Sequence, residues 1–440
     1  MVTKVQTDLS AIKTQEKKKV YEHFIRSLKD SGGLASTNSF NNYDSSRMSA
    51  VESFSEVKAP DGKKLSEKLK TVGTPDATTA AQSITTALEQ SDNYKDAKKD
   101  FNTDLTNLND LLLAGKYSLG DAASYMLEAK NTAVNAIQAQ QTLERDNLSK
   151  LFEKDDFKTQ MKTALGCSDA ELQAIKTQMT ADLKKSQDEK LDEFKKGLED
   201  NANQLFKKAE QEYWRISFLG HRYLSNKAMK EEIDRMAAEA EKKDPTLSMH
   251  SGIKGSDRLK HIDPTKLTTH VSITGTTLQA GGEGAEFSLS TEFNRWYTTD
   301  HRIYVTLTSI AEELKARGSD TITFQINDTD PKRAKEIAKK AFESAIIAGF
   351  PPDKINIKVN GESLYSSDYD EKAKKAKVDD KLFTDDPKRL QFAKSKFQKG
   401  AEEREAFIKG NNTGKLKAEL QDLKAKAREA EKSAAPRLGP

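Results

Sequence analysis

The clearest fold signal in the chain is the sequence TITFQINDTDPKRAKEIAKKAFESAIIAGFPPDKINIKVNG at residues 321–361. Residues 321–326 alternate apolar and polar side chains, as a half-buried strand does. Asp330 suits a helix N-cap and Pro331 the first helical position, and an apolar stripe then continues to Gly349. Residues 355–359 alternate again. A strand, a helix and a strand with short connections predict a βαβ unit whose two strands are parallel.

The chain before this unit is patterned for long helices. One apolar stripe consists of Phe101, Leu105, Leu108 and Leu112. A short break at 115–118 separates it from a second helical run, which predicts an antiparallel helical hairpin. The sequence Ser168-Asp169-Ala170-Glu171 is a capping box. It begins a third run with no proline before Pro245, so we expect one long coiled-coil-like helix or two helices end to end.

The predicted fold is therefore mostly α with a small α/β domain: a helical hairpin and a long helix, then a mixed sheet containing the βαβ unit. The predicted segments are an N-terminal helix (1–30), a flexible linker rich in Ser, Asn and Thr (31–75), the hairpin and long helix (76–250), the α/β module (251–365) and a charged helical tail (366–440). Within the module we expect strands at 268–276 and 286–290, a glycine loop at 281–284 and a helix at 304–317.

The charge balance, the cysteine count and the hydropathy of the chain exclude or disfavour several classes of protein. Charged residues make up 32% of the chain, but Lys+Arg (72) and Asp+Glu (69) nearly cancel to +3, which disfavours a nucleic-acid binder. Cys167 is the only cysteine, so no intramolecular disulfide can form. The N-terminus lacks the apolar segment of a Sec signal, and no stretch reaches the roughly 20 apolar residues of a membrane span. We expect a soluble, cytoplasmic protein.

Candidate catalytic residues lie at the entrance to the α/β module. His261, His270 and His301, with Asp263, could form an acid–base or metal site, and a metal-dependent hydrolase would be one such enzyme. Surface or packing roles are the favoured explanation of the same residues. Their spacing matches no known metal-ligand motif, and the glycine loop at 281–284 lacks the phosphate-binding form, so the sequence predicts no cofactor and no metal.

Two further features, Cys167 and an apolar patch on the long helix, allow both a structural and a functional interpretation. Cys167 precedes the long helix, whose dipole would lower the pKa of its thiol. The helix also becomes apolar around more of its circumference at Tyr213, Trp214, Phe218 and Leu219. Something must cover this patch. The cover is either the rest of the chain or a partner protein, and in the second case these four residues would bind the partner.

A resemblance concerns about 60 residues, from Ile303 to Asn360. Its signature is Ile322-Thr323-Phe324, then Asp330-Pro331-Lys332, then AGFPPDKI at 348–355. The segment resembles a small C-terminal α/β module of large helix-rich proteins that the Dot/Icm type IV secretion system of Legionella and Coxiella delivers. The run Glu402-Glu403-Arg404-Glu405 resembles the glutamate-rich translocation signals of such effectors. The resemblance implies a bacterial source, Sec-independent delivery and a location in the host cytosol. It implies no particular activity.

The sequence as a whole favours a non-enzymatic protein that binds a protein partner, which the resemblance implies is a host protein. The alternative is an enzyme with its site in the histidine-rich stretch 250–301.

Overall fold

The computed structural model describes most of the chain. The described residues are 40, 43–44, 57–71, 73–113, 117–243, 259, 262–281, 286–288, 300–370, 375–410 and 412–434. The predicted helix at 1–30 lies outside them. The chain divides into two compact units: unit 1 contains residues 1–17 and 206–411, and unit 2 contains residues 18–205 and 412–440. The division differs from the predicted segments, because it falls within one helix and assigns the last helix to unit 2.

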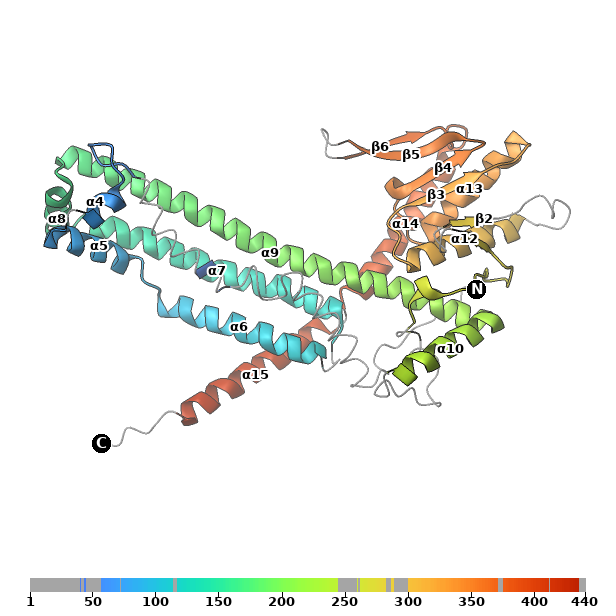
Figure 1. The fold of residues 1–440 in the computed structure, drawn as a ribbon, viewed down its shortest axis with the longest axis horizontal. Helices are drawn as coiled ribbons and strands as arrows, with labels where there is room; N and C mark the ends of the chain where they lie inside the picture. Colours follow the sequence, from blue (N-terminus) through green and yellow to red (C-terminus); the bar gives the residue numbers. More distant parts are fainter. Residues whose placement is uncertain are drawn as a thin grey trace. The chain divides into compact units, whose positions relative to one another are not determined.

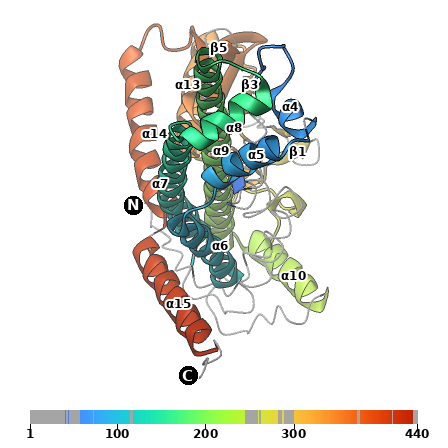
Figure 2. The ribbon, with the colours of Figure 1, turned by 90° about the vertical axis from the view of Figure 1, so that its left-hand side faces the viewer.

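Unit 2 consists of helices (Figures 1 and 2). They are α4 (Leu65–Thr71), α5 (Pro75–Ala87), α6 (Asp92–Leu113), α7 (Leu119–Leu151), α8 (Asp155–Leu165), the part of α9 (Asp169–Ser225) that ends at Leu205, and α15 (Thr413–Ala434). Helices α4, α5 and α8 pack together, and α15 packs on α6 and α7.

The predicted hairpin and its following helix are confirmed. α6 packs on α7, and α7 begins at a capping box in which Ser118 and Asp121 each satisfy the other's backbone N–H. The predicted capping box before α9 also forms, with the Ser168 N–H donating to Glu171 at 2.8 Å. α9 is 57 residues long. It ends at Ser225, and the side chain of the next residue, Asn226, accepts from the Met229 N–H at the start of α10 (Lys227–Lys243) in unit 1.

The predicted linker at 31–75 is wrong over its second half. α4 lies there, and Val57, Leu65 and Leu69 are buried in one core with residues of α5, α8 and α9. Phe40 and Tyr43 are also buried, and both rings contact Phe194 of α9. Burial of a few large apolar side chains against the helices therefore stabilises this segment despite its polar composition.

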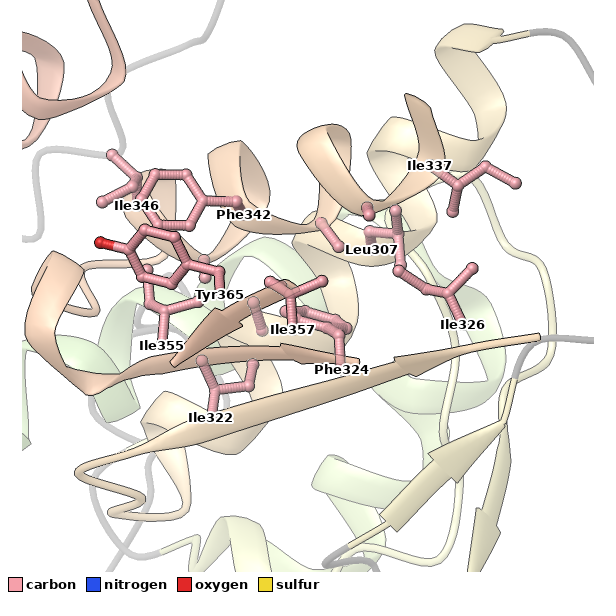
Figure 3. Packing of buried hydrophobic residues seen from close by; sticks show 14 of the residues in the cluster. Leu307, Ile322, Phe324, Ile326, Ile337, Phe342, Ile346, Ile355, Ile357 and Tyr365 are labelled. Atoms are coloured by element: carbon pink, nitrogen blue, oxygen red, sulfur yellow. The ribbon is translucent and has the colours of Figure 1, made fainter. Parts of the chain in front are cut away.

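Unit 1 contains the predicted α/β module. β3 (Ile322–Ile326) and β4 (Ile355–Val359) are parallel, with α13 (Pro331–Ile347) between them in the chain. The Asp330 side chain caps α13 as predicted. Figure 3 shows Phe342 and Ile346 of α13 facing Tyr365 and the isoleucines of the sheet. α12 (Asp300–Ala316) confirms the helix expected at 304–317, and it packs beside α13.

Two more strands extend the sheet. β5 (Glu362–Asp370) and β6 (Lys375–Asp380) complete the order β3-β4-β5-β6, and the last two pairings are antiparallel. The turn between β4 and β5 is Asn360-Gly361, with positive φ at both residues, as a tight hairpin turn requires. The prediction of a helical tail from 366 was thus wrong up to Asp380, because the hairpin is rich in charge and lacks apolar alternation.

The stretch entering the module also differs from prediction. The expected strand at 268–276 is a turn closed by the Ser272 and Thr276 backbones, with a single bridge between Val271 and Thr277. The strand pair is instead β1 (Gln279–Gly281) with β2 (Glu286–Ser288), which are antiparallel, so the strand expected at 286–290 is confirmed in part. Residues 282–284 of the predicted glycine loop lie outside the described residues.

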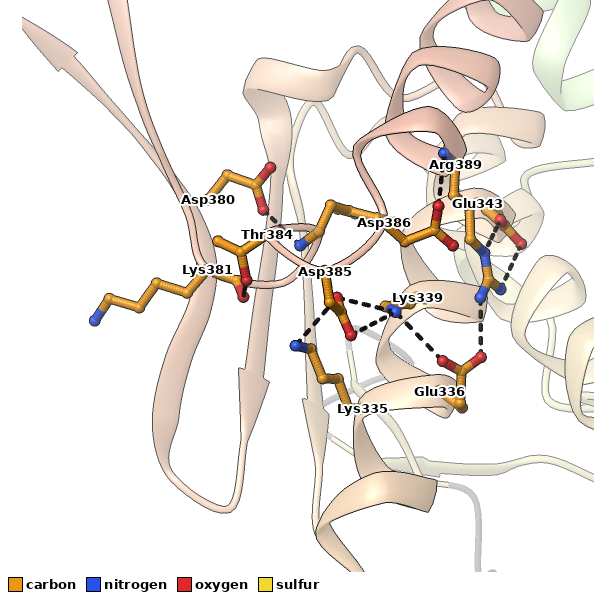
Figure 4. Close-up of polar contacts among 11 residues, drawn as sticks. Lys335, Glu336, Lys339, Glu343, Asp380, Lys381, Thr384, Asp385, Asp386 and Arg389 are labelled. Carbon is orange, nitrogen blue, oxygen red and sulfur yellow. Dashed lines mark hydrogen bonds and ion pairs between the residues drawn. The ribbon is translucent and has the colours of Figure 1, made fainter.

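Helix α14 (Pro387–Ile408) is attached to α13 by ion pairs (Figure 4). Arg389 binds Glu343 and Glu336, and Lys339 binds Asp385 and Glu336. Lys339 is 4% exposed, so its charge needs these partners. The helical part of the predicted tail is present as α14 and α15.

The helices that the structure describes include none with the length and apolar character needed to cross a membrane.

The contact between Gly349 and Trp214 gives a test of packing in unit 1. Gly349 has φ +88°, and a methyl group there would overlap the Trp214 ring. We expect Gly349→Ala to lower the free energy of unfolding by about 2–4 kcal/mol, from left-handed strain plus overpacking. Gly361→Ala is the control, since it has φ +86° but open space around it. It should cost only about 1–2 kcal/mol. Equal losses in urea unfolding would show that the ring does not press on Gly349.

Candidate interaction site

The patch predicted to bind a partner is covered by unit 1 itself. Trp214 lies against Gly349, with the Arg404 guanidinium 5.1 Å from its ring centroid. Phe218 and Leu219 are buried in a core with residues of α10 and the segment 259–271. Tyr213 is half-buried and packs edge-on against Trp214. These side chains anchor the α/β module, and the hypothesis that they form an exposed partner-binding patch is wrong.

The predicted histidine site is not assembled by the described residues. His301 is exposed on α12, and His261 lies outside the described residues. Asp263 caps a short 3₁₀ turn by accepting from the Thr265 N–H. His270 pairs through Nδ1 with the buried Glu313 carboxylate at 2.6 Å. In the parts of the chain that the structure describes, no three His, Cys, Asp or Glu side chains are grouped as a metal site requires.

His270 belongs instead to a buried charge network on α12. Glu313 also accepts from Arg317 at 3.0 Å, and both side chains are nearly fully buried. The neighbouring Glu312 lies 3.4 Å from the guanidinium of Arg222, which is completely buried and donates to the Ser309 carbonyl. Burial lowers the pKa of Arg222, while Glu312 and Glu313 oppose that effect. The network joins α9, α12 and the segment around His270 within unit 1, which is a structural role.

A second buried carboxylate holds the same segment. Glu232 of α10 accepts from the backbone N–H groups of Thr268 and Thr269, both at 2.8 Å, and from the Thr268 hydroxyl at 2.6 Å. Burial alone would raise the pKa of Glu232, but these hydrogen bonds outweigh it and lower the pKa below its usual value. Glu232 of α10 and Glu313 of α12 therefore hold residues 268–270 in place from two helices. These three residues are called the strap below.

Cys167 does not have the character of a nucleophile. Burial and the nearby Glu171 carboxylate raise the pKa of its thiol, and these effects outweigh its backbone hydrogen bond and the nearby lysines. The expectation of a helix-activated thiolate is therefore wrong.

Unit 2 carries an open groove of about 470 Å³. Its lining residues are Val57, Lys58, Pro60, Glu171, Ala174, Ile175 and Gln178. Val57 and Ile175 are 2% and 4% exposed and form an apolar floor. The other five residues are exposed and form the rim. One wall is the first turns of α9, and the other is the loop 57–64. An open groove of this size, with an apolar floor and a mixed rim, suits side chains of a peptide.

The loop wall also offers main-chain hydrogen bonds. Lys58 forms an isolated antiparallel bridge with Lys64, closed by the Ala59 N–H to Lys63 and the Leu65 N–H to Val57. In such a pair the N–H and C=O of the central residue point away from the bridge. The contacts of the described residues give neither group of Lys58 a partner. Lys58, which lines the groove, therefore has a backbone donor and acceptor without a described partner, as residues of peptide-binding edges do.

Sequence reasoning missed this groove because its loop wall was expected to be a linker. The available signals were Val57, the turn residues Asp61-Gly62 and the paired Leu65 and Leu69. They are local hints, and only the packing of the loop on α9 gives them a role.

No protein-family model, curated protein sequence or solved structure matches this chain. Its function is therefore inferred from its own residues and contacts.

Glu232 gives a pH-dependent test of the strap. Its folded pKa lies below the ordinary value of 4.5, so its stabilisation is complete above pH 4.5 and is lost as the pH falls through the folded pKa. We expect Glu232→Gln to cost about 1–2 kcal/mol of unfolding free energy at neutral pH, with the difference from wild type shrinking as the pH falls below 4.5 and through the folded pKa. The control is Glu231→Gln, since Glu231 is exposed on the same helix. A difference that does not change with pH would contradict this role.

Proposed function

We propose that this chain is a non-enzymatic interaction protein and that the groove on unit 2 binds an extended peptide segment of a protein partner. The observation that carries the proposal is the groove's combination of an apolar floor, a polar rim and the free main-chain groups of Lys58. The floor gives a site for one or two aliphatic side chains of a peptide, and the backbone groups give its main chain a hydrogen-bonding direction.

The charges at the rim narrow the choice of peptide. Lys58 has no ion pair among the described contacts, whereas the Glu171 carboxylate is engaged with the Ser168 N–H and hydroxyl. Glu171 stays ionised, because these hydrogen bonds lower its pKa, but its oxygens are already engaged with Ser168, whereas the Lys58 ammonium group is available to a carboxylate of the peptide. A peptide with an acidic residue beside an aliphatic one fits this arrangement.

The proposal extends to the setting of the interaction. The resemblance of residues 303–360 to a module of Dot/Icm effectors supports delivery into a host cytosol, where the partner would be a host protein. Residues 402–405, the glutamate-rich run, lie within α14. In a translocation assay with a reporter fused to the full chain, we expect signal in host cells only from a bacterium with a working secretion system. Equal signal from a transport-deficient strain would contradict it.

Groove binding is tested by filling the groove. Peptides are selected from a random display library on the full chain, and their dissociation constants are measured by fluorescence anisotropy. We expect acidic–aliphatic peptides to be enriched, and Ala174→Arg to weaken them at least about tenfold, since the new side chain occupies the groove.

Gln173→Arg is the matched control, because Gln173 is exposed next to Ala174 in α9 but does not line the groove. Selected peptides that bind the Ala174→Arg chain as well as wild type would refute the groove as the site. Failure to enrich any peptide would refute the proposed function.

A further inference from the structure

Helix α15 is a docked element of unit 2. The rest of the unit is one continuous stretch, 18–205, and α15 joins it only after the whole of residues 206–411. Its contacts with α6 and α7 therefore link residues about 300 positions apart in the chain, as between Asp104 and Lys424. Nothing covalent within unit 2 keeps α15 on this surface, so its noncovalent contacts must do so.

Burial is greatest in the first half of α15. Leu416 and Leu420 are completely buried, but the side chains at 425–430 are exposed. In the second half, described ion pairs join Lys424 to the nearly buried Asp104 and Arg428 to Asp100, the latter pair more than half exposed on its arginine side. An exposed ion pair contributes little, and a lone helix of this length is only marginally stable. The part of α15 near Arg428 is therefore attached less firmly than the part near Leu416.

The surface beneath α15 is acidic. Asp100 and Asp104 come from α6, and Asp121 and Glu128 come from α7. Asp104 is 6% exposed and is shared between Lys424 and the hydroxyl of Tyr125. Burial and this hydrogen bond raise the pKa of Tyr125, so it serves as a donor to the carboxylate. Asp100, Asp104 and Glu128 each pair with a basic side chain of α15, and Asp121 accepts from the Asn412 N–H just before the helix.

The pairing defines a simple recognition pattern. Leu416, Leu420, Lys424 and Arg428 stand four residues apart along one helical face, and Lys417 beside them binds Glu128 at 2.7 Å. Two leucines enter the apolar part of the surface, and the basic residues that follow meet the acidic row.

We propose that the α6–α7 surface bearing Asp100, Asp104, Asp121 and Glu128 is a docking site for a basic amphipathic helix of a protein partner. α15 occupies this site within the chain and holds it closed, and a partner helix with the same leucine and lysine/arginine spacing displaces it. The site is separate from the groove of the proposed function, and it adds a second, regulated interaction surface to unit 2.

The test uses the full chain and a fluorescein-labelled peptide of residues 412–434. Lys424→Glu/Arg428→Glu removes both ion pairs of the helix's second half. We expect this variant to bind the peptide about tenfold more tightly than wild type, because its own α15 competes less, and binding should weaken as salt rises.

Controls separate docking from a general charge effect. Lys415→Glu/Lys426→Glu makes the same charge change on side chains with no described contact to α6 or α7, since Lys426 pairs with Asp422 of its own helix. It should bind like wild type. Leu420→Ala, which loosens α15 without changing charge, should again bind more tightly, and circular dichroism verifies that each variant is folded. Ala174→Arg should leave peptide binding unchanged, so failure here is distinguishable from failure of the groove.

Two results would overturn the proposal. One is equal peptide affinity for wild type and both loosened variants. The other is equal binding of a peptide that carries Glu at 424 and 428, which would show that the acidic row does not select its ligand.

Discussion

The apolar stripe of α9 is the constraint on which both units depend. In unit 2 it includes Leu172, Met179 and Leu198, and in unit 1 it includes Trp214 and Leu219, all of them buried. A helix cannot bury such a stripe by itself, so each unit must supply cover from other parts of the chain. The loop 57–64, α4, α5, α7 and α8 do so in unit 2, and the α/β module with α10 does so in unit 1.

The same constraint explains where the candidate surfaces lie. In unit 1 the cover is thorough: Trp214 is held against Gly349, and the strap around His270 is fixed by Glu232 and Glu313. Trp214 and His270, which the sequence offered as candidate functional residues, therefore have packing roles. In unit 2 the cover of α9 includes the short loop 57–64, beside which the groove lies open, whereas α15 docks separately on α6 and α7. These are the two surfaces that we propose for protein partners.

The predictable part of the fold was the part with local signals. The βαβ unit could be predicted from strand alternation, the Asp330-Pro331 helix start and Gly349. The capping box at Ser168 likewise predicted the start of α9. β5 and β6 were not predictable in this way, because their stability comes from pairing with β4 and not from an apolar pattern of their own. The candidate sites depend on contacts of long sequence separation. No local pattern could place Val57 beside Ile175, or Lys424 beside Asp104.

Native-state hydrogen exchange along α9, measured by mass spectrometry on the full chain, tests the role of the stripe most directly. If the stripe is buried in both units, amides from Leu198 to Leu219 should be protected without interruption and more strongly than those of α15. Rapid exchange confined to the residues between Leu205 and Trp214 would contradict this, because the helix would then be two separately stabilised pieces and not one element shared by two cores.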